Sequence, residues 1–509
     1  MKGLLTDIPN VEETNAMTSE MEDWGAETWK YTIDNLTLDG YRAYIDKFRN
    51  FGYIISAENA AGLRNYFYNV VMKKDNRTLR MSYYTKLSRL TASVSYIAYQ
   101  VRYDAEKVYE GVPMTGLDSD VDASDYGADN YVKHFENKSQ MDYNAYLSVL
   151  KDNGYSRFSE SSVGTENKVY NAVYTKGEQV LTVTYIQKQE TLYLSATYNL
   201  PLSEHLNYNA SYIAGNTQGA ATKLHMLKLY QSAYGNSFII ELKNGHFIVS
   251  DGGMNAEMES FIQYIKSLVP AGEKPVIEAW FISHAHVDHA GLLRVMAQSE
   301  KWRDEVYVEG IYYNEPNELV QALDPGTVAD VALIRRAADC LKTESGTHPQ
   351  LYRTQTGQVY YFNDISVGVV AAQEQIPFEN YSGDFNDSST WLMLNVGNQK
   401  CLLGGDGDLG GMKFIMNSYD ADYLDLDVFT LLHHGYNTWD NFTNFIKRID
   451  TVLVTDAVGK DSIYSTNGNA NLRNKSKEWI AWGDGTKILS FPYTVGSYRS
   501  LPSEAERIV

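Results

Sequence analysis

The stretch that decides the fold is SHAHVDHAG at residues 283–291. It holds three histidines and one aspartate in the turn after a predicted strand, a density of metal-binding side chains that few structural roles need. His284 and His286 are two residues apart, so on extended backbone they point to the same side and can chelate one ion. Asp288 and His289 lie on the following turn and can reach a second ion. The spacing therefore predicts a site for two metal ions.

The residues before this motif predict alternating strands and helices. Apolar runs at 238–242 and 247–250 around an Asn-Gly turn indicate a hairpin, and the second run ends in Asp-Gly-Gly at 251–253. A helix is predicted from 255 to 269, followed by a buried strand at 276–283. The motif thus begins just past a strand end, where folds built of α/β layers place their ligand sites.

This order of residues resembles the metallo-β-lactamase superfamily. The pattern H-x-H-x-D-H follows a strand, and an earlier strand ends in D-G-G. The resemblance covers residues 224–498 and implies an αββα sandwich with the metals in a cleft along one edge of the two sheets. We therefore expect an α+β protein with a hydrolase domain at residues 222–500.

Two later motifs match further ligands of that family. Residues 402–406 read LLGGD and resemble the family's G-D motif, whose aspartate bridges both metals; Asp406 is our choice and Asp408 is the local alternative. A predicted strand then ends in His-His-Gly. Because relatives have a single histidine directly before this glycine, we assign the ligand to His434 and expect His433 to contact substrate or to protonate a leaving group. The reverse order of the two histidines stays open.

The family's usual third histidine on the first metal is absent. Asn386 stands at that position, whereas His348 lies in a Thr-His-Pro loop and is expected at the surface. The run Asn-Asp-Ser-Ser at 386–389, taken with the other motifs, resembles the metallo-β-lactamase-like domain of competence DNA-uptake channel proteins, which also have asparagine there. An amide oxygen or a water makes the first site harder, so Mn²⁺ is an alternative to Zn²⁺.

The resemblance implies a metal-dependent hydrolase that directs a metal-activated water at an ester. The subgroup favours a phosphodiester, and other esters, lactones and amides are alternatives. Asp406 would hold the ions and orient the water, and Asp288 would serve both metal binding and catalysis. His433 or Ser388 would hydrogen-bond the developing charge. The alternative function is a non-catalytic protein that keeps its metal for structure or sensing and binds a partner or ligand through its N-terminal repeats.

Those repeats show as ungapped matches at a constant offset of 102 residues, such as Tyr41 with Tyr143. Each copy reads as an amphipathic helix followed by three alternating strands, so we expect αβββ repeats at 25–110 and 130–205. They resemble no family that we recognise. Their many tyrosines are expected to pack in the core and to pair across strands, with a ligand-binding surface as the alternative.

The net charge of −20 repels polyanions, so we expect a small ester or phosphodiester as substrate and no extended nucleic acid as partner. The sequence has no apolar run long enough for a signal peptide or a membrane span. We therefore expect no membrane partner and a cytoplasmic protein, or a secreted one if an export signal has been removed. Cys340 and Cys401 are too few for a disulfide framework and are expected to be core thiols. The sequence predicts no oligomeric state.

Overall fold

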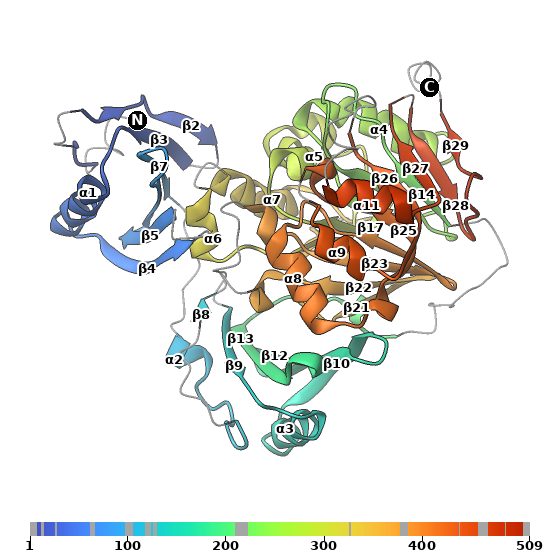
Figure 1. Ribbon diagram of the computed structural model, residues 1–509, viewed down its shortest axis with the longest axis horizontal. Coiled ribbons are helices and arrows are strands. Elements are labelled where there is room, and N and C mark those ends of the chain that lie inside the picture. The colour runs from blue at the N-terminus through green and yellow to red at the C-terminus, as the bar shows by residue number, and fades with distance from the viewer. Residues whose placement is uncertain are drawn as a thin grey trace. The chain divides into compact units, whose positions relative to one another are not determined.

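The computed structural model shows a chain that forms two compact units (Figure 1). It describes residues 8–11, 15–25, 28–61, 67–96, 105–117, 124–125, 130–208, 222–324, 327–376, 385–436, 438–456, 467–483 and 485–501. Unit 1 comprises Met1–Arg102, Pro316–Leu333 and Pro377–Phe385; unit 2 comprises Tyr103–Glu315, Ile334–Ile376 and Asn386–Val509. No helix in the described ranges combines the length and the hydropathy that a membrane crossing needs.

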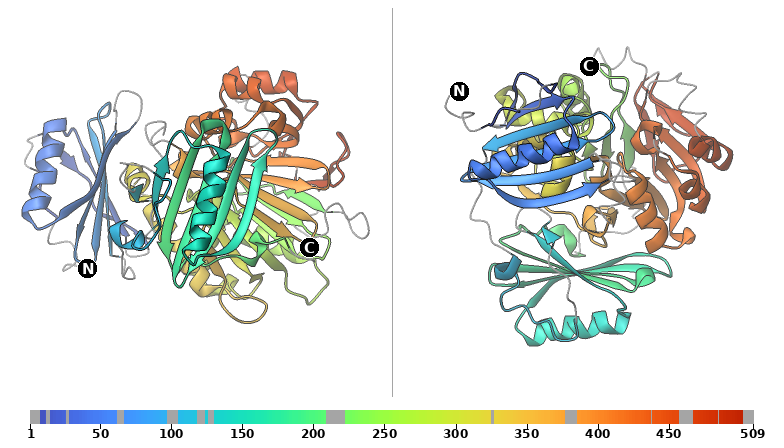
Figure 2. Two further views of the ribbon diagram at one scale, coloured as in Figure 1. Left: turned by 90° about the horizontal axis from the view of Figure 1, so that it is seen from below. Right: turned by 60° about the vertical axis from the view of Figure 1, so that its left-hand side comes forward.

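Unit 1 is built on an antiparallel sheet with helix α1 (Leu38–Asn50) on one face (Figure 2). The helix starts after Thr37, whose side chain accepts a hydrogen bond from a backbone amide of the first turn. Its buried residues Tyr41, Tyr44 and Phe48 pack on apolar side chains of the sheet. In pairing order the strands are β1 (Met17–Thr18), β3 (Thr28–Asp34), β7 (Arg89–Tyr96), β6 (Arg77–Tyr84), β5 (Phe67–Lys74) and β4 (Ile54–Ala61), with β2 (Glu22–Gly25) beside β3.

A segment from the middle of the chain completes unit 1. Helix α6 (Glu318–Leu323) contacts strands β4, β5 and β6. Lys73 is the neighbour of the core residue Met72, so its side chain leaves the sheet on the face opposite α1. There its ammonium group lies 2.7 Å from the buried carboxylate of Glu318. Residues predicted as part of the C-terminal domain thus pack with the first repeat.

Unit 2 begins with a second module of the same design. Helix α3 (Gln140–Asp152) begins 102 residues after α1, and strands β10–β13 follow β4–β7 at the same separation to within one residue. A capping box between Ser139 and Asp142 fixes the start of α3. In pairing order the strands are β10 (Ser156–Gly164), β11 (Lys168–Lys176), β12 (Gln179–Ile186), β13 (Thr191–Tyr198), β9 (Tyr131–Phe135) and β8 (Ser124–Asp125); the short helix α2 (Ala105–Val108) precedes them.

The structure corrects the strand count of both modules. Each helix is followed by four strands instead of the expected three, and further strands precede it: β1 to β3 before α1, and β8 and β9 before α3. The missed strands after the helix, β4 and β10, lie at the edges of their sheets. In β10 most side chains are polar and exposed or half-buried, so the alternation of apolar and polar residues that signals a strand is nearly absent.

The rest of unit 2 is the expected αββα sandwich. Side chains from both sheets, among them Phe281 and Leu394, form one core between them. Phe261 of α4 stacks on Trp280 on the outer side of one sheet, and Phe442 of α9 packs against Trp391 of the other. The helices are α4 (Met258–Ser267), α5 (Val287–Gln298), α8 (Leu409–Ser418), α9 (Asp440–Phe445), α11 (Asn467–Lys475) and the second part of α7 (Val328–Cys340), whose residues up to Leu333 belong to unit 1.

Both sheets of the sandwich mix parallel and antiparallel pairs. The first sheet has the order β20 (Gln350–Tyr352), β19 (Gly310–Tyr313), β17 (Val276–Ile282), β16 (Phe247–Asp251), β15 (Ser237–Glu241), β14 (Lys223–Met226), β28 (Lys487–Ser490), β29 (Arg499–Ser500), with β18 (Tyr307–Val308) beside β17. The second has the order β21 (Val359–Phe362), β22 (Ile365–Ala371), β23 (Trp391–Val396), β24 (Gln399–Leu403), β25 (Asp425–Thr430), β26 (Arg448–Val454), β27 (Glu478–Ala481). The predicted hairpin is β15–β16, turned at Asn244-Gly245, and the predicted buried strand is β17.

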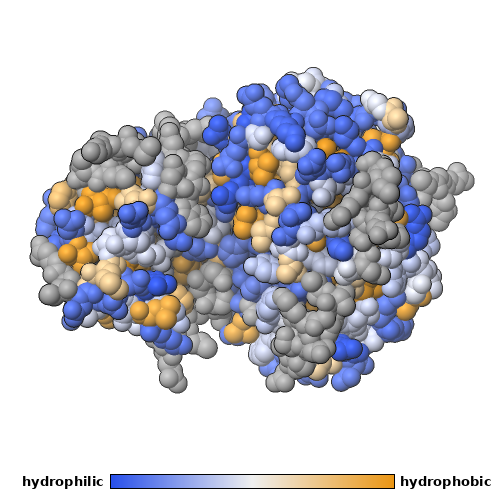
Figure 3. All heavy atoms as spheres, turned by 90° about the horizontal axis from the view of Figure 1, so that it is seen from above, coloured by the Kyte–Doolittle hydropathy of each residue, from blue (hydrophilic) through white to orange (hydrophobic). Residues whose placement is uncertain are grey.

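Polar side chains dominate the surface of unit 2, and apolar ones fill its interior. In the view of Figure 3 its hydrophobic side chains appear singly or in small groups on a mostly hydrophilic face. Cys401 is buried in the core, as expected, whereas Cys340 at the end of α7 is only half-buried; both are free thiols.

Within unit 2 the second module docks on the sandwich through hydrogen bonds near the end of α8. The ammonium group of Lys188 donates to the carbonyls of Met416 (3.0 Å) and Tyr419 (2.7 Å). Asn167 donates its backbone amide and its side-chain amide to the carboxylate of Asp420, both at 2.8 Å. These bonds lower the pKa of Asp420. The module is therefore attached to the helix that follows Asp406.

Replacing Asp420 by alanine should lower the free energy of unfolding by about 1–3 kcal/mol, because two hydrogen bonds to a charged acceptor are lost. Urea unfolding of the full chain measures this value. The matched control is Asp422→Ala, which removes an exposed ion pair with Lys447 and should cost less than about 1 kcal/mol. Equal effects of the two substitutions would contradict the docking role of Asp420.

Candidate metal centre

The motif SHAHVDHAG lies where β17 passes into α5. His286 is the residue before the first turn of α5 and has extended backbone (φ −61°, ψ 148°). Asp288 and His289 belong to that first turn, and His284 lies between strand and helix. The sequence predicted this placement directly after a strand. Both predicted ligand pairs therefore start from one end of the first sheet.

Four buried side chains from three parts of the chain converge at this end. They are Asp288, His289, Asp406 and His434, and one ligand atom of each lies within 4.8 Å of those of the others. His289 Nε2 is 3.0 Å from Asp406 Oδ1. His434 Nε2 is 3.1 Å from Asp288 Oδ2 and 3.4 Å from Asp406 Oδ2. We call these four residues the ligand cluster.

His284 and His286 form a pair beside the ligand cluster. His284 Nε2 lies 2.9 Å from His286 Nδ1, so two imidazole nitrogens face one point. The His284 ring is 4.2 Å from that of His289 between centroids. Burial and the neighbouring imidazoles of His289 and His286 hold the pKa of His284 well below its usual range. His284 is therefore neutral, the form in which histidine binds metal.

The charges of the ligand cluster balance one another. Burial opposes ionisation of His289 and His434, but the charges of nearby aspartates more than offset it. They raise the pKa of His289 well above its usual range and that of His434 to about 9. In return, the two histidines lower the pKa of Asp288 and Asp406 despite burial. The buried carboxylates of Asp288 and Asp406 are thus stable as a pair only with positive charge beside them.

A divalent cation fits this demand and this donor set. His289 Nε2 and Asp406 Oδ1 are buried and make no hydrogen bond among the described residues, although they face each other. Imidazole nitrogen and carboxylate oxygen are ligands of Zn²⁺ and of Mn²⁺. A cation at this point would replace the protons that the two histidines otherwise carry.

Asp251 holds His289 from behind, a role that the sequence reasoning missed. Its Oδ2 lies 2.8 Å from His289 Nδ1, and its carboxylate also accepts hydrogen bonds from the backbone amide (2.8 Å) and the hydroxyl (2.9 Å) of Ser283. The backbone of Asp251 is left-handed, with φ 59°. This contact turns His289 Nε2 toward the ligand cluster. In the sequence, the signal for this residue is the Asp-Gly-Gly motif at 251–253.

The two histidines that follow β25 take different positions. His434 is buried in the ligand cluster, and its Nδ1 lies 3.0 Å from the Thr455 hydroxyl. The His433 side chain is 25% exposed, and its Nε2 is 3.7 Å from Asp406 Oδ2. Both residues and Gly435 have positive φ (46°, 53° and 100°). The tight turn sends the first imidazole to the edge of the site and the second into it.

Residues 386–389 lie on the other side of His433. The Asn386 side-chain amide nitrogen is 3.5 Å from His433 Nδ1, so this residue lies beside His433. Ser388, expected to hydrogen-bond the developing charge, is fully buried. The hydroxyl of Ser389 instead lies 3.3 Å from His284 Nδ1.

The Gly-Asp motif brings Asp406 into the ligand cluster and leaves Asp408 outside it. Asp408 caps helix α8, because its carboxylate accepts a hydrogen bond from the Leu409 amide at 2.7 Å. Gly405 has φ 55°, and a Cβ there would lie 2.6 Å from the Cβ of Ser283. The motif therefore needs glycine to approach the histidine motif. His348 is exposed, as expected, with its Nδ1 2.7 Å from the Leu341 carbonyl.

Comparison with known proteins gives the same family. The model of the metallo-beta-lactamase superfamily matches residues 233–349. Among solved structures, the chain is similar to Zn²⁺-bound PqqB from Methylobacterium extorquens at 13% identity and a TM-score of 0.31, over 50% of this chain and 89% of that one. No curated protein matches the chain. The stretch that is similar to the metallo-beta-lactamase superfamily thus contains strands β15 to β19 and the SHAHVDHAG motif of this chain.

Proposed function

We propose that the protein is a metal-dependent hydrolase of phosphodiesters or related small esters. The proposal rests on one observation: two aspartates and two histidines converge in the buried ligand cluster, beside the neutral His284 and its neighbour His286. A divalent cation bound there supplies a Lewis acid that activates water and stabilises negative charge on the ester.

The residues divide into two sets of ligands. The ligand cluster would hold one ion through its four side chains. His284 and His286 would hold a neighbouring ion, with Asp406 shared between the ions and Asn386 close by. The imidazole-rich set favours Zn²⁺. The amide oxygen of Asn386 keeps Mn²⁺ as the alternative.

Two further residues keep the imidazoles in the orientation that metal binding needs. Asp251 accepts the Nδ1 proton of His289, which leaves the lone pair on Nε2 directed at the ligand cluster. The Thr455 hydroxyl does the same at Nδ1 of His434. Such partners fix the tautomer and the ring angle and make the imidazole more basic.

His433 would act on the substrate. It lies at the partly exposed edge of the ligand cluster, between Asp406 and Asn386. From there its imidazole can hydrogen-bond the ester and pass a proton to the oxygen of the leaving group as that bond breaks. Asp288, which contacts His434 Nε2, would hold its ion and orient the attacking water.

Two exposed tyrosines flank the same edge and bear on substrate class. Tyr234 is 40% exposed with its ring 5.5 Å from that of His434, and Tyr436 is 46% exposed with its ring 5.9 Å from that of His433. Exposed aromatic rings favour substrates with an apolar or aromatic group. The net charge of −20 disfavours long polyanions. A small ester with a ring substituent fits both features.

Replacing Asp251 by asparagine should weaken Zn²⁺ binding about 10–100-fold, because an amide holds the His289 imidazole without the negative charge. Competition with a chromophoric chelator measures the affinity. Asp408→Asn is the matched control, because Asp408 lies outside the ligand cluster, and its affinity should stay unchanged. Equal affinities of wild type and Asp251→Asn would rule out the supporting role.

Metal content should distinguish the two adjacent histidines. Replacing His434 by alanine should remove one ion per chain, because this imidazole lies in the ligand cluster. Replacing His433 by alanine should leave the metal content unchanged. Elemental analysis after dialysis measures both. The reverse pattern would transfer the ligand role to His433.

His433→Ala should depress turnover of bis-p-nitrophenyl phosphate about 100-fold at unchanged metal content, the size expected for loss of a proton-transferring group. Steady-state kinetics measure kcat, and His348→Ala is the control for loss of an exposed histidine. Full turnover by metal-loaded His433→Ala would exclude this role. Metal-loaded wild type that cleaves neither this ester nor any of a lactone panel would contradict the hydrolase and favour a metal-retaining binding protein.

A further inference from the structure

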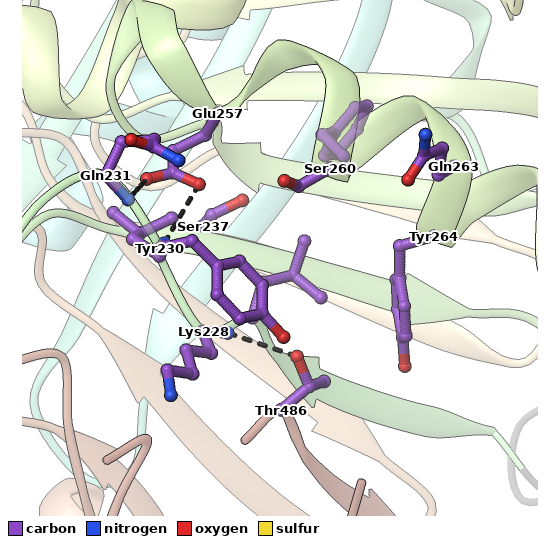
Figure 4. A pocket seen from close by; sticks show the side chains of 13 residues that line it. Lys228, Tyr230, Gln231, Ser237, Glu257, Ser260, Gln263, Tyr264 and Thr486 are labelled. Atoms are coloured by element: carbon purple, nitrogen blue, oxygen red, sulfur yellow. Dashed lines mark hydrogen bonds between the residues drawn. The ribbon is translucent and has the colours of Figure 1, made fainter. Parts of the chain in front are cut away.

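A cavity of about 120 Å³ lies between helix α4 and the segment that joins β14 to β15 (Figure 4). Leu229, Tyr230 and Gln231 of the joining segment form part of its wall, and α4 contributes Ser260 and Tyr264. None of the residues assigned to metal binding lines this cavity. It is therefore a separate space within the sandwich.

Two hydroxyl groups at the cavity have no hydrogen-bond partner in the part of the chain that the structure describes. Ser237, at the start of β15, is 1% exposed, and its Oγ has no hydrogen-bond partner among the described residues. The Tyr230 hydroxyl is likewise buried without a partner. Buried hydroxyls are nearly always hydrogen-bonded to protein, to water or to a ligand. A ligand with a hydroxyl or a carbonyl group would satisfy them.

The two charged groups at the cavity, Glu257 and Lys228, make hydrogen bonds to the protein backbone. The Glu257 carboxylate accepts hydrogen bonds from the backbone amides of Tyr230 (3.0 Å) and Gln231 (2.5 Å), and burial raises its pKa. The ammonium group of Lys228 donates to the Gly483 carbonyl at 3.1 Å. Because the two groups have opposite charges and each is held by hydrogen bonds within the protein, the lining has no net charge that would attract an ion, and the cavity favours an uncharged ligand.

Size and lining point to a ring. Figure 4 shows the side chains of Tyr230 and Tyr264 facing the cavity, with Ser260 and Gln263 above them on α4. Phe261 adds apolar lining. A cavity of about 150 Å³ lined by apolar side chains takes up benzene. The space here is slightly smaller and half polar, which suits one six-membered ring with one polar substituent.

Three connections join the wall of the cavity to the ligand cluster: a close contact, a hydrogen bond and a covalent neighbour. A Cβ on Gly235 would lie 2.7 Å from Leu229 and 2.9 Å from the Asp288 carbonyl, so these three residues are in tight contact. Asn236, next to Ser237, donates its backbone amide to the same carbonyl at 3.1 Å. Gly252 lines the cavity and directly follows the aspartate that holds His289. A molecule that moves this wall therefore moves metal ligands.

We propose that this cavity binds a small uncharged ring compound carrying a hydroxyl or carbonyl group, and that its occupancy changes the affinity of the ligand cluster for metal. The first part is independent of the proposed hydrolysis. The second part requires metal binding at the ligand cluster but no catalytic activity.

The test uses phenol and benzamide as probes on the full chain, with isothermal titration calorimetry as the measurement. We expect saturable binding of one probe molecule per chain. Ser260→Phe, which fills the cavity, should weaken binding at least tenfold, whereas the matched Ser267→Phe on the exposed side of the same helix should not. Ser237→Ala should weaken phenol about fivefold, the loss expected for one hydrogen bond. Benzoate should bind at least tenfold more weakly than benzamide.

The coupling is tested by Zn²⁺ titration with and without saturating phenol. The apparent Kd for zinc should change at least threefold in wild type, and the same factor should appear in phenol binding with and without zinc. Ser260→Phe should abolish the change. Absence of saturable probe binding, or equal binding by folded Ser260→Phe, would overturn the site. Unchanged zinc affinity at saturating phenol would overturn the coupling. Neither readout uses turnover, so failure of the hydrolase proposal is detected separately.

Discussion

The repulsion between two buried carboxylates is the constraint on which the site depends. Asp288 and Asp406 lie within reach of the same imidazoles, away from water. Two like charges about 4 Å apart repel by about 4 kcal/mol at an effective dielectric constant of about 20. The fold must supply positive charge at this point or give up the arrangement. Protonated His289 and His434 supply it in the metal-free chain, and a divalent cation supplies it with fewer protons.

Strands fixed in the core, and turns with left-handed backbone, hold the two carboxylates and the two imidazoles close together. Each carboxylate or imidazole of the ligand cluster follows a strand whose other end is fixed in the core between the two sheets. Left-handed backbone occurs at three non-glycine residues of the site: at His433 and His434, and at Asp251, which holds His289. Such conformations persist only where the surrounding structure enforces them. The packed core between the two sheets therefore keeps the side chains of the ligand cluster in position.

The sequence predicted the side chains that gather at this point because they follow short motifs at strand ends, and residues 283–291 contribute Asp288 and His289 to the ligand cluster, with His284 and His286 beside it. It did not reveal Asp251 as the partner of His289, because a D-G-G turn looks the same whether its carboxylate faces water or an imidazole. The edge strands β4 and β10 were missed because exposed strands lack apolar alternation. The pairing of α6 with the first module was missed because contacts between distant segments leave no local pattern.

The path of the chain through unit 1 has a consequence for synthesis on the ribosome. The strands of this unit emerge first, but α6, which covers their second face, is made about 200 residues later, a delay of roughly 10–40 s at common elongation rates. Until α6 has been made, the sheet face that carries Lys73 lacks the helix and the ion pair with Glu318. Because α6 follows these strands in the chain, synthesis passes through a ribosome-bound intermediate in which the first module is incomplete. Strand β4 lies at the edge of this sheet, and an uncovered edge strand can pair with other chains during the delay.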